Sequence, residues 1–201
     1  MPPVAILAGM GGELASKADE IKLDSMLQGL SKGLNVETRL NELYSFINNP
    51  ERAFMVSNLF RQTLLAQSPV VCCILGIILS DCIDNDHTLQ YADLIILNSL
   101  QTATDFEIKY IKEIINNYVD DGYVDENAIE KSLMATEYYM TLEWCKTNRI
   151  LGTTGMREIN GMTIFSEFLI INTCTERFLD YIERARVFLE YEDSRAQREV
   201  Q

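Results

Sequence analysis

Apolar residues recur at helical spacing through the first hundred positions of the chain. Between residues 13 and 34, leucine, isoleucine and alanine return every three or four positions, with charged residues in the gaps. Residues 36–47, 51–67 and a stretch beginning near Thr88 repeat this spacing. The period is typical of amphipathic helices, and no convincing alternation of period two interrupts it. We therefore predict a helical bundle over residues 1–103, with a helix break at Gly9–Gly12 before the helix of residues 13–34.

Residues 69–83 depart from the amphipathic pattern. Ser68 and Pro69 form a helix start, with serine as the N-cap and proline in the first turn. The residues after them, VVCCILGIILSDCI, are apolar on every side of a helix, which indicates burial on every side. Small side chains at Cys72, Gly76 and Ser80 lie four apart and let another helix approach closely. We expect this helix to be the centre of the N-terminal bundle.

After Thr104 the pattern changes. Thr104-Asp105-Phe106-Glu107 has the spacing of a capping box, and it opens a helix that ends near Asp120-Asp121-Gly122. One short extended step, Tyr123-Val124, precedes a helix capped by Asp125. A longer helix is expected from Glu137 to about Asn148.

Two extended segments follow that helix, at residues 149–154 and 163–171. Asn160-Gly161 lies between them, and this pair favours a tight hairpin turn. Thr173-Cys174-Thr175-Glu176 reads as a second capping box before a helix that buries Phe178, Ile182, Ala185 and Leu189. The prediction is a mainly α chain: the bundle, a module at residues 104–189 with one β-hairpin, and a charged tail at residues 190–201.

The order helix, short strand, helix, helix, hairpin, helix resembles the winged-helix (winged helix-turn-helix) superfamily over residues 105–185. A strand that runs into NTCTERFLDYIERAR is similar to the end of the wing in such regulators. The resemblance implies that residues 137–148 occupy the recognition position and residues 155–161 the wing tip. In DNA-binding members these parts reach the grooves of the duplex. The candidate contact residues are Tyr139, Glu143, Lys146, Thr147, Arg149 and Arg157.

Charge argues against a nucleic-acid partner. The chain has a formal net charge of -13 and a pI near 4.5, and an acidic surface repels a phosphate backbone. On the candidate helix Glu137 and Glu143 cancel Lys146 and Arg149, and on the wing Glu158 cancels Arg157. A DNA reader carries uncancelled basic groups at such places. We expect the module to serve for docking or dimerisation.

Candidate chemistry is sparse. His87 is the single histidine, so a second imidazole for a triad or a two-histidine metal site is missing. No phosphate loop, dinucleotide fingerprint or nucleophile elbow is present. The acidic loop at residues 81–87 is better explained as solvated than as a metal site, and residues 120–125 do not fit a calcium loop. We expect no catalytic residue, no cofactor and no metal.

The remaining features concern location. Five cysteines, an odd number, three of them in or beside one apolar stretch, favour buried thiols in a reducing, cytoplasmic compartment. Residues 2–10 are apolar but lack the basic start of a secretory signal. The longest apolar run, residues 69–79, is shorter than the roughly 20 residues of a membrane span.

The leading hypothesis is a non-catalytic intracellular interaction or regulatory protein of bacterial or phage origin, which acts through protein contacts. Homodimerisation is one form of such contact. A variant of this hypothesis is an acidic protein that occupies the DNA site of another protein. The alternatives are a sequence-specific DNA-binding regulator that gathers Lys146, Arg149 and Arg157 into one face, and an enzyme without a linear motif.

Overall fold

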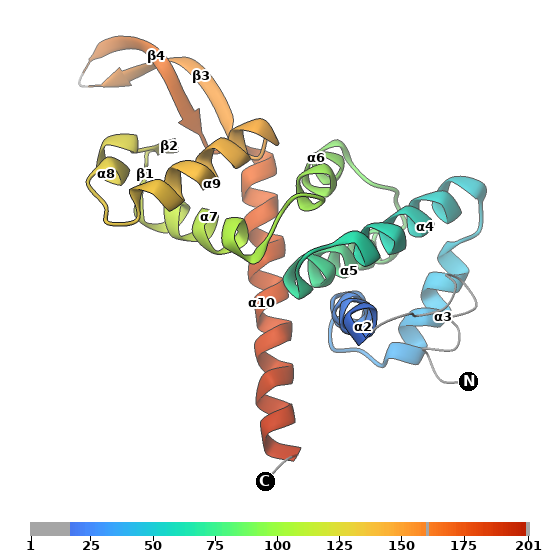
Figure 1. The fold of residues 1–201 in the computed structure, drawn as a ribbon. Helices are drawn as coiled ribbons and strands as arrows, with labels where there is room; N and C mark the ends of the chain where they lie inside the picture. The colour runs from blue at the N-terminus through green and yellow to red at the C-terminus, as the bar shows by residue number, and fades with distance from the viewer. Residues whose placement is uncertain (1–16, 160, 200–201) are drawn as a thin grey trace. The chain divides into compact units, whose positions relative to one another are not determined.

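A computed structural model describes residues 17–159 and 161–199 of the chain (Figure 1). The predicted break at residues 9–12 lies outside these ranges. The described chain is mainly helical, as predicted, with a small antiparallel sheet in its C-terminal half. It divides into two compact units, Met1–Gln90 with Tyr181–Gln201, and Tyr91–Asp180. The boundaries expected from the sequence were residues 103 and 189. Residues 91–103 therefore belong to the second unit and not to the predicted bundle, and residues 181–189 belong to the first unit and not to the predicted module.

The first unit is helical. Asn35, Asn49 and Ser68 cap three of its helices by accepting hydrogen bonds from backbone amides in the first turn, and Pro69 stands in the first turn of the third, as predicted. The helices are α2 (Lys17–Ser31), α3 (Val36–Phe46), α4 (Pro50–Leu65), α5 (Pro69–Asp84) and the part of α10 (Thr173–Glu199) that follows Asp180.

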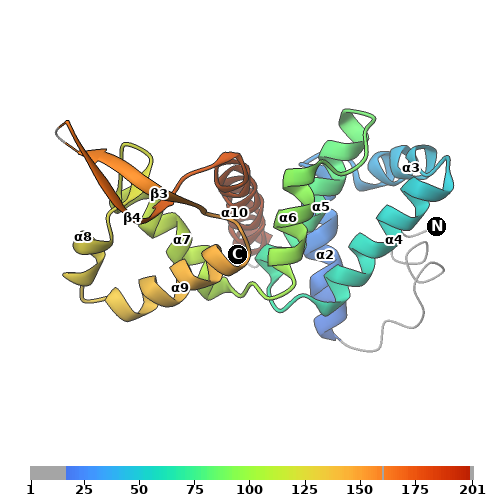
Figure 2. The ribbon, with the colours of Figure 1, turned by 90° about the horizontal axis from the view of Figure 1, so that it is seen from above.

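Helix α5 is the centre of this unit, as the apolar pattern predicts, because every residue from Val71 to Ser80 is buried. Helix α2 lies beside it (Figure 2). A Cβ atom placed on Gly76 would lie 2.0 Å from the Met26 carbonyl oxygen, and one on Gly29 would lie 2.0 Å from the Cys73 carbonyl oxygen. The two backbones therefore touch at a glycine from each helix.

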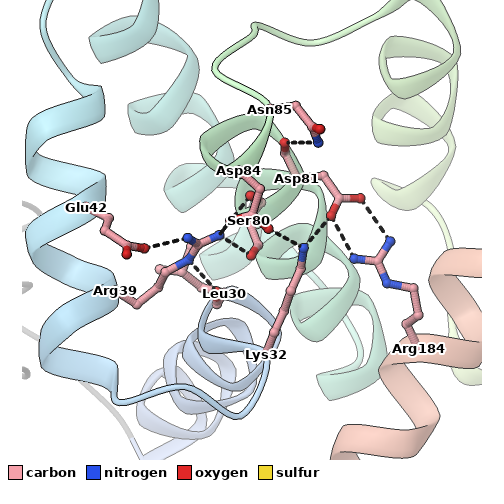
Figure 3. A network of polar contacts seen from close by, with 9 residues as sticks. All are labelled: Leu30, Lys32, Arg39, Glu42, Ser80, Asp81, Asp84, Asn85 and Arg184. Carbon is pink, nitrogen blue, oxygen red and sulfur yellow. Dashed lines mark hydrogen bonds and ion pairs between the residues drawn. The ribbon is translucent and has the colours of Figure 1, made fainter.

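A network of polar contacts surrounds the C-terminal end of α5 (Figure 3). Arg39 of α3 is only 3% exposed. Its guanidinium donates to the Leu30 carbonyl at 3.0 Å and the Ser80 carbonyl at 2.8 Å, and it forms ion pairs of 2.6 Å with Glu42 and Asp84. Buried charge is tolerated only when it is paired and hydrogen-bonded, and Arg39 meets both conditions.

Asp81 links the same network to the C-terminal helix. Arg184 of α10 donates two hydrogen bonds to its carboxylate, at 2.9 and 2.8 Å, and Lys32 donates a third at 2.6 Å. Burial alone raises the pKa of Asp81, but the hydrogen bonds from Arg184 and Lys32 outweigh it and leave the pKa below its ordinary value. The same holds for Asp84. Burial raises its pKa, but hydrogen bonds from Lys32 and Arg39 outweigh burial and leave the pKa below its ordinary value.

The second unit combines helices with a four-stranded antiparallel sheet of order β1-β2-β4-β3. Helix α7 packs against α9, which also contacts α8 (Figure 1). The elements are α6 (Tyr91–Leu100), α7 (Asp105–Asn117), β1 (Val119–Asp120), β2 (Tyr123–Val124), α8 (Glu126–Glu130), α9 (Ala135–Thr147), β3 (Gly152–Ile159), β4 (Met162–Ile170) and the start of α10.

The expectation of one β-hairpin is wrong, because the sheet contains two. Strands β3 and β4 form the predicted one, with Ile159 opposite Met162. Strands β1 and β2 form another, with Asp120 opposite Tyr123. Both residues of its turn, Asp121 and Gly122, have positive φ, 48° and 79°, which is the conformation that short hairpins favour.

Of the two capping boxes expected in this unit, one is present as predicted and the other begins one residue earlier. The capping box of Thr104 and Glu107 is present. The one expected at Thr173 is displaced by one residue: Asn172 accepts from the Thr175 amide at 3.0 Å, and the Thr175 hydroxyl accepts from the Asn172 amide at 3.2 Å. Thr175 also donates to the Ile150 carbonyl at 2.5 Å. That bond fixes the start of α10 to the segment before β3.

Candidate interaction surface

The outward face of α9 is the first candidate surface. Thr136, Met140, Glu143 and Thr147 are all exposed, and their spacing of four, three and four places them on one side of the helix. Met140 is 62% exposed. This face thus presents one carboxylate, one large apolar side chain and two hydroxyls. Glu143 and Thr147 belong to the predicted contact set; Met140 does not, although its spacing from them was readable in the sequence.

The other two predicted residues of α9 are half-buried and engaged in contacts within the unit. The Tyr139 hydroxyl donates to the Glu126 carbonyl at 3.2 Å. Lys146 forms an ion pair of 2.7 Å with Glu167 of β4, and the hydrogen bond to Glu167 raises the pKa of the ammonium group. Lys146 therefore keeps its charge, and that charge faces a carboxylate of its own chain.

The predicted cations beyond α9 differ from each other. Arg149 is exposed and has a φ of 60°. Arg157 of β3 forms an ion pair of 3.3 Å with Asp120, and its guanidinium lies 4.3 Å from the centre of the Tyr123 ring. The structure thus directs Arg157 to the turn between β1 and β2, and it does not bring the three predicted cations into one uncompensated group.

The hairpin of β3 and β4 is the second candidate surface, because large apolar side chains are exposed along it. Met156 is 58% exposed, Met162 67% and Ile164 41%. Isolated apolar side chains on a surface are ordinary. Three on one hairpin, together with the exposed Met140 of α9, give the second unit several large apolar side chains on its surface.

Two further aromatic residues of α9, Tyr138 and Trp144, pack within the unit. Tyr138 is 6% exposed and its ring lies 5.6 Å from that of Tyr110 and 5.3 Å from that of Tyr118. Trp144 donates its indole N–H to the Thr102 hydroxyl at 3.1 Å and lies beside Phe178. These rings stabilise the unit.

The first unit has a depression of about 550 Å³, lined by residues of α3, α4 and α5 and of the loops beside them. Its charged groups are already engaged. Arg52 pairs with Asp86 at 2.8 Å and lies 4.3 Å from the centre of the Phe46 ring, while Glu42 pairs with Arg39. We assign this depression no ligand.

Within residues 17–159 and 161–199, no group of three or more histidine, cysteine, aspartate or glutamate side chains is arranged to hold a metal ion. In the loop that was weighed as a metal site, Asp81 and Asp84 bind lysine and arginine instead. His87 Nδ1 lies 2.8 Å from the Thr88 carbonyl oxygen. No helix in the same residues is long and apolar enough to cross a membrane.

Comparison of the chain with protein-family models, with curated protein sequences and with solved structures finds no match in any of the three.

Proposed function

We propose that this chain is a non-catalytic interaction or regulatory protein, and that its C-terminal part is a winged-helix-like module used for contact with protein. The order of elements from α7 to α10 supports the winged-helix assignment. So does the sheet, in which the short strand β2 pairs with β4 (Tyr123 opposite Ile170) and β4 pairs with β3. In this assignment α9 is the recognition helix and the β3–β4 hairpin is the wing.

The observation that carries the proposal is the state of the cations at these two places. A DNA reader donates from lysine and arginine to phosphates and base edges. Here Lys146 is held by Glu167 and Arg157 by Asp120. Binding to DNA would have to break both pairs and then bring the remaining carboxylates close to phosphates.

The exposed groups favour a protein partner. The outward side of α9 offers Met140 beside Glu143, and the wing offers Met156 and Met162. Methionine is adaptable in shape and enriched at protein interfaces. The net charge of -13 favours a basic or neutral surface over an acidic one.

A titration of labelled random duplex DNA, followed by fluorescence anisotropy at about 50 and about 200 mM salt, tests the proposal, since binding through phosphates falls steeply over that range. We expect no binding at either concentration. The matched variants are Glu167→Gln and Asp120→Asn. Each replaces one carboxylate by an uncharged amide, and they release Lys146 and Arg157 respectively. Binding by the unmodified chain that weakens with salt would overturn the proposal in favour of the DNA-binding alternative.

A further inference from the structure

Strand β3 is the long edge of the sheet. The strand order leaves β1 and β3 at the two edges, and β1 has two residues whereas β3 has eight. An edge strand presents a row of backbone N–H and C=O groups that can pair with another strand. The edge formed by β3 is therefore the place where this sheet can be extended.

Most of the devices that usually protect such an edge are missing from β3, although Glu158 leaves one charge on it. The strand GTTGMREI contains neither lysine nor proline. Its one arginine, Arg157, is turned towards Asp120 and Tyr123. The irregularity of the β3–β4 pairing lies on the inner strand: from Thr154 to Met156 is two steps, whereas their partners Phe168 and Phe165 are three steps apart. The extra residue is on β4, so β3 itself stays regular.

Symmetry limits how β3 can pair with a second copy of itself. A two-fold axis that relates two antiparallel strands is perpendicular to the sheet and keeps each side chain on its own face. Residues directly opposite each other also share a face. The axis must therefore pass beside one residue that faces its own copy, and pairings centred between two residues are excluded.

Charge excludes two of the remaining centres, and the exposed Met156 side chain favours a third. An axis at Arg157 or at Glu158 would place two like charges directly opposite each other, which is destabilising. An axis at Met156 places Arg157 opposite Gly155 and Glu158 opposite Thr154, and aligns residues 153–159 of one copy with residues 159–153 of the other. It also covers the exposed Met156 side chain with its own copy. An axis at Gly155 places Met156 opposite Thr154 of the other copy, so the two Met156 side chains do not contact each other.

We infer that the chain forms a two-fold dimer in which the β3 edges of two copies pair in antiparallel orientation about Met156, joining two sheets into one. The inference rests on the proposed function, since it names a second copy as a protein partner of the module. One strand pair is a small interface compared with the roughly 1,200–2,000 Å² of stable complexes. The dimer is therefore reversible and its mass depends on concentration.

Sedimentation equilibrium of the full chain, up to about 100 µM because small interfaces are weak, measures the dimer directly. Two matched variants locate it: Met156→Lys on the edge strand and Met162→Lys on the inner strand, at methionines of similar exposure, 58% and 67%. We expect Met156→Lys to weaken dimerisation at least tenfold, because two lysines would face each other, and Met162→Lys to leave it unchanged. Circular dichroism verifies that both variants fold.

A charge-swap mixture tests the register. Met156→Lys and Met156→Glu are each expected to be monomeric, while an equimolar mixture forms a heterodimer because position 156 faces itself. The inference is overturned if the unmodified chain stays monomeric, if Met162→Lys dissociates the dimer as Met156→Lys does, or if the mixture does not associate. None of these results affects the DNA titration, so the proposed function is judged separately.

Discussion

Replacing Gly76 with alanine is expected to force α2 and α5 apart. The new methyl group would lie 2.0 Å from the Met26 carbonyl oxygen and 2.8 Å from the Leu30 amide nitrogen. Cβ contacts in proteins do not fall below 3.0 Å, so the helices must separate by about 1 Å. The atoms in the way belong to the backbone, and no change of rotamer relieves them.

The magnitude follows from two opposing effects. Overpacking a core by one methyl group costs about 1–3 kcal/mol, and a clash between backbones belongs at the upper end. Alanine is about 1 kcal/mol better than glycine inside a helix. The free energy of unfolding should fall by about 2 kcal/mol, which lowers the midpoint of thermal unfolding by about 4–8 °C for a chain of this size.

Thermal and urea unfolding followed by circular dichroism at the helix band measure this change. Gly155→Ala is the matched control, because a Cβ there meets no atom within 4 Å. Gly29→Ala should match Gly76→Ala, and the double variant should cost less than the sum, since one separation of the helices accommodates both methyl groups. A Gly76→Ala variant as stable as the unmodified chain, or full additivity, would refute the close helix crossing.

Three further predictions concern the first unit and the thiols. Arg39→Met should lower the free energy of unfolding by about 1–3 kcal/mol in urea titrations, because it leaves the buried Leu30 and Ser80 carbonyls without this donor. Arg52→Met, whose partner is 83% exposed, should cost about 0–1 kcal/mol. The lowered pKa values of Asp81 and Asp84 contribute stability that is fully present well above the unfolded pKa of about 3.9 and is lost as the pH falls through the folded values. The urea midpoint should therefore begin to drop about one unit above that unfolded pKa and keep falling below it, and Asp81→Asn should flatten the drop. A thiol reagent should label half-buried Cys174 first under native conditions. It should reach the other four, Cys72, Cys73, Cys82 and Cys145, only on unfolding, because they are buried. Burial also raises the pKa of Cys72 and Cys73 to about 12. Labelling of all five at one rate would contradict their burial.

Local signals explain the parts of the fold that the sequence predicts. Ser68 before Pro69, and Thr104 three residues before Glu107, specify helix starts through contacts within one turn, and both are present in the structure. The β1–β2 hairpin also had a local signal, the pair Asp121-Gly122. It was missed because these residues were interpreted only as a helix end and as a candidate calcium loop.

Contacts between distant segments explain what the sequence does not show. Gly76 was recognisable as a small residue on an apolar helix, but nothing local identifies Gly29 as the residue it meets. Arg39 stands in a polar stretch, and its burial depends on distant partners such as the Ser80 carbonyl, 41 positions away, which accepts its hydrogen bond. Lys146 resembles a free basic group until β4 brings Glu167 within 2.7 Å.

The central claim, that the exposed side of α9 meets protein and not nucleic acid, is tested most directly by photo-cross-linking. A benzophenone amino acid at Met140, which is 62% exposed, would capture whatever lies against that face in the cells that produce the chain. The adduct is then treated separately with nuclease and with protease. The account predicts an adduct that persists after nuclease treatment and yields peptides of a partner chain on proteolysis. An adduct that disappears with nuclease and contains nucleotides would contradict it.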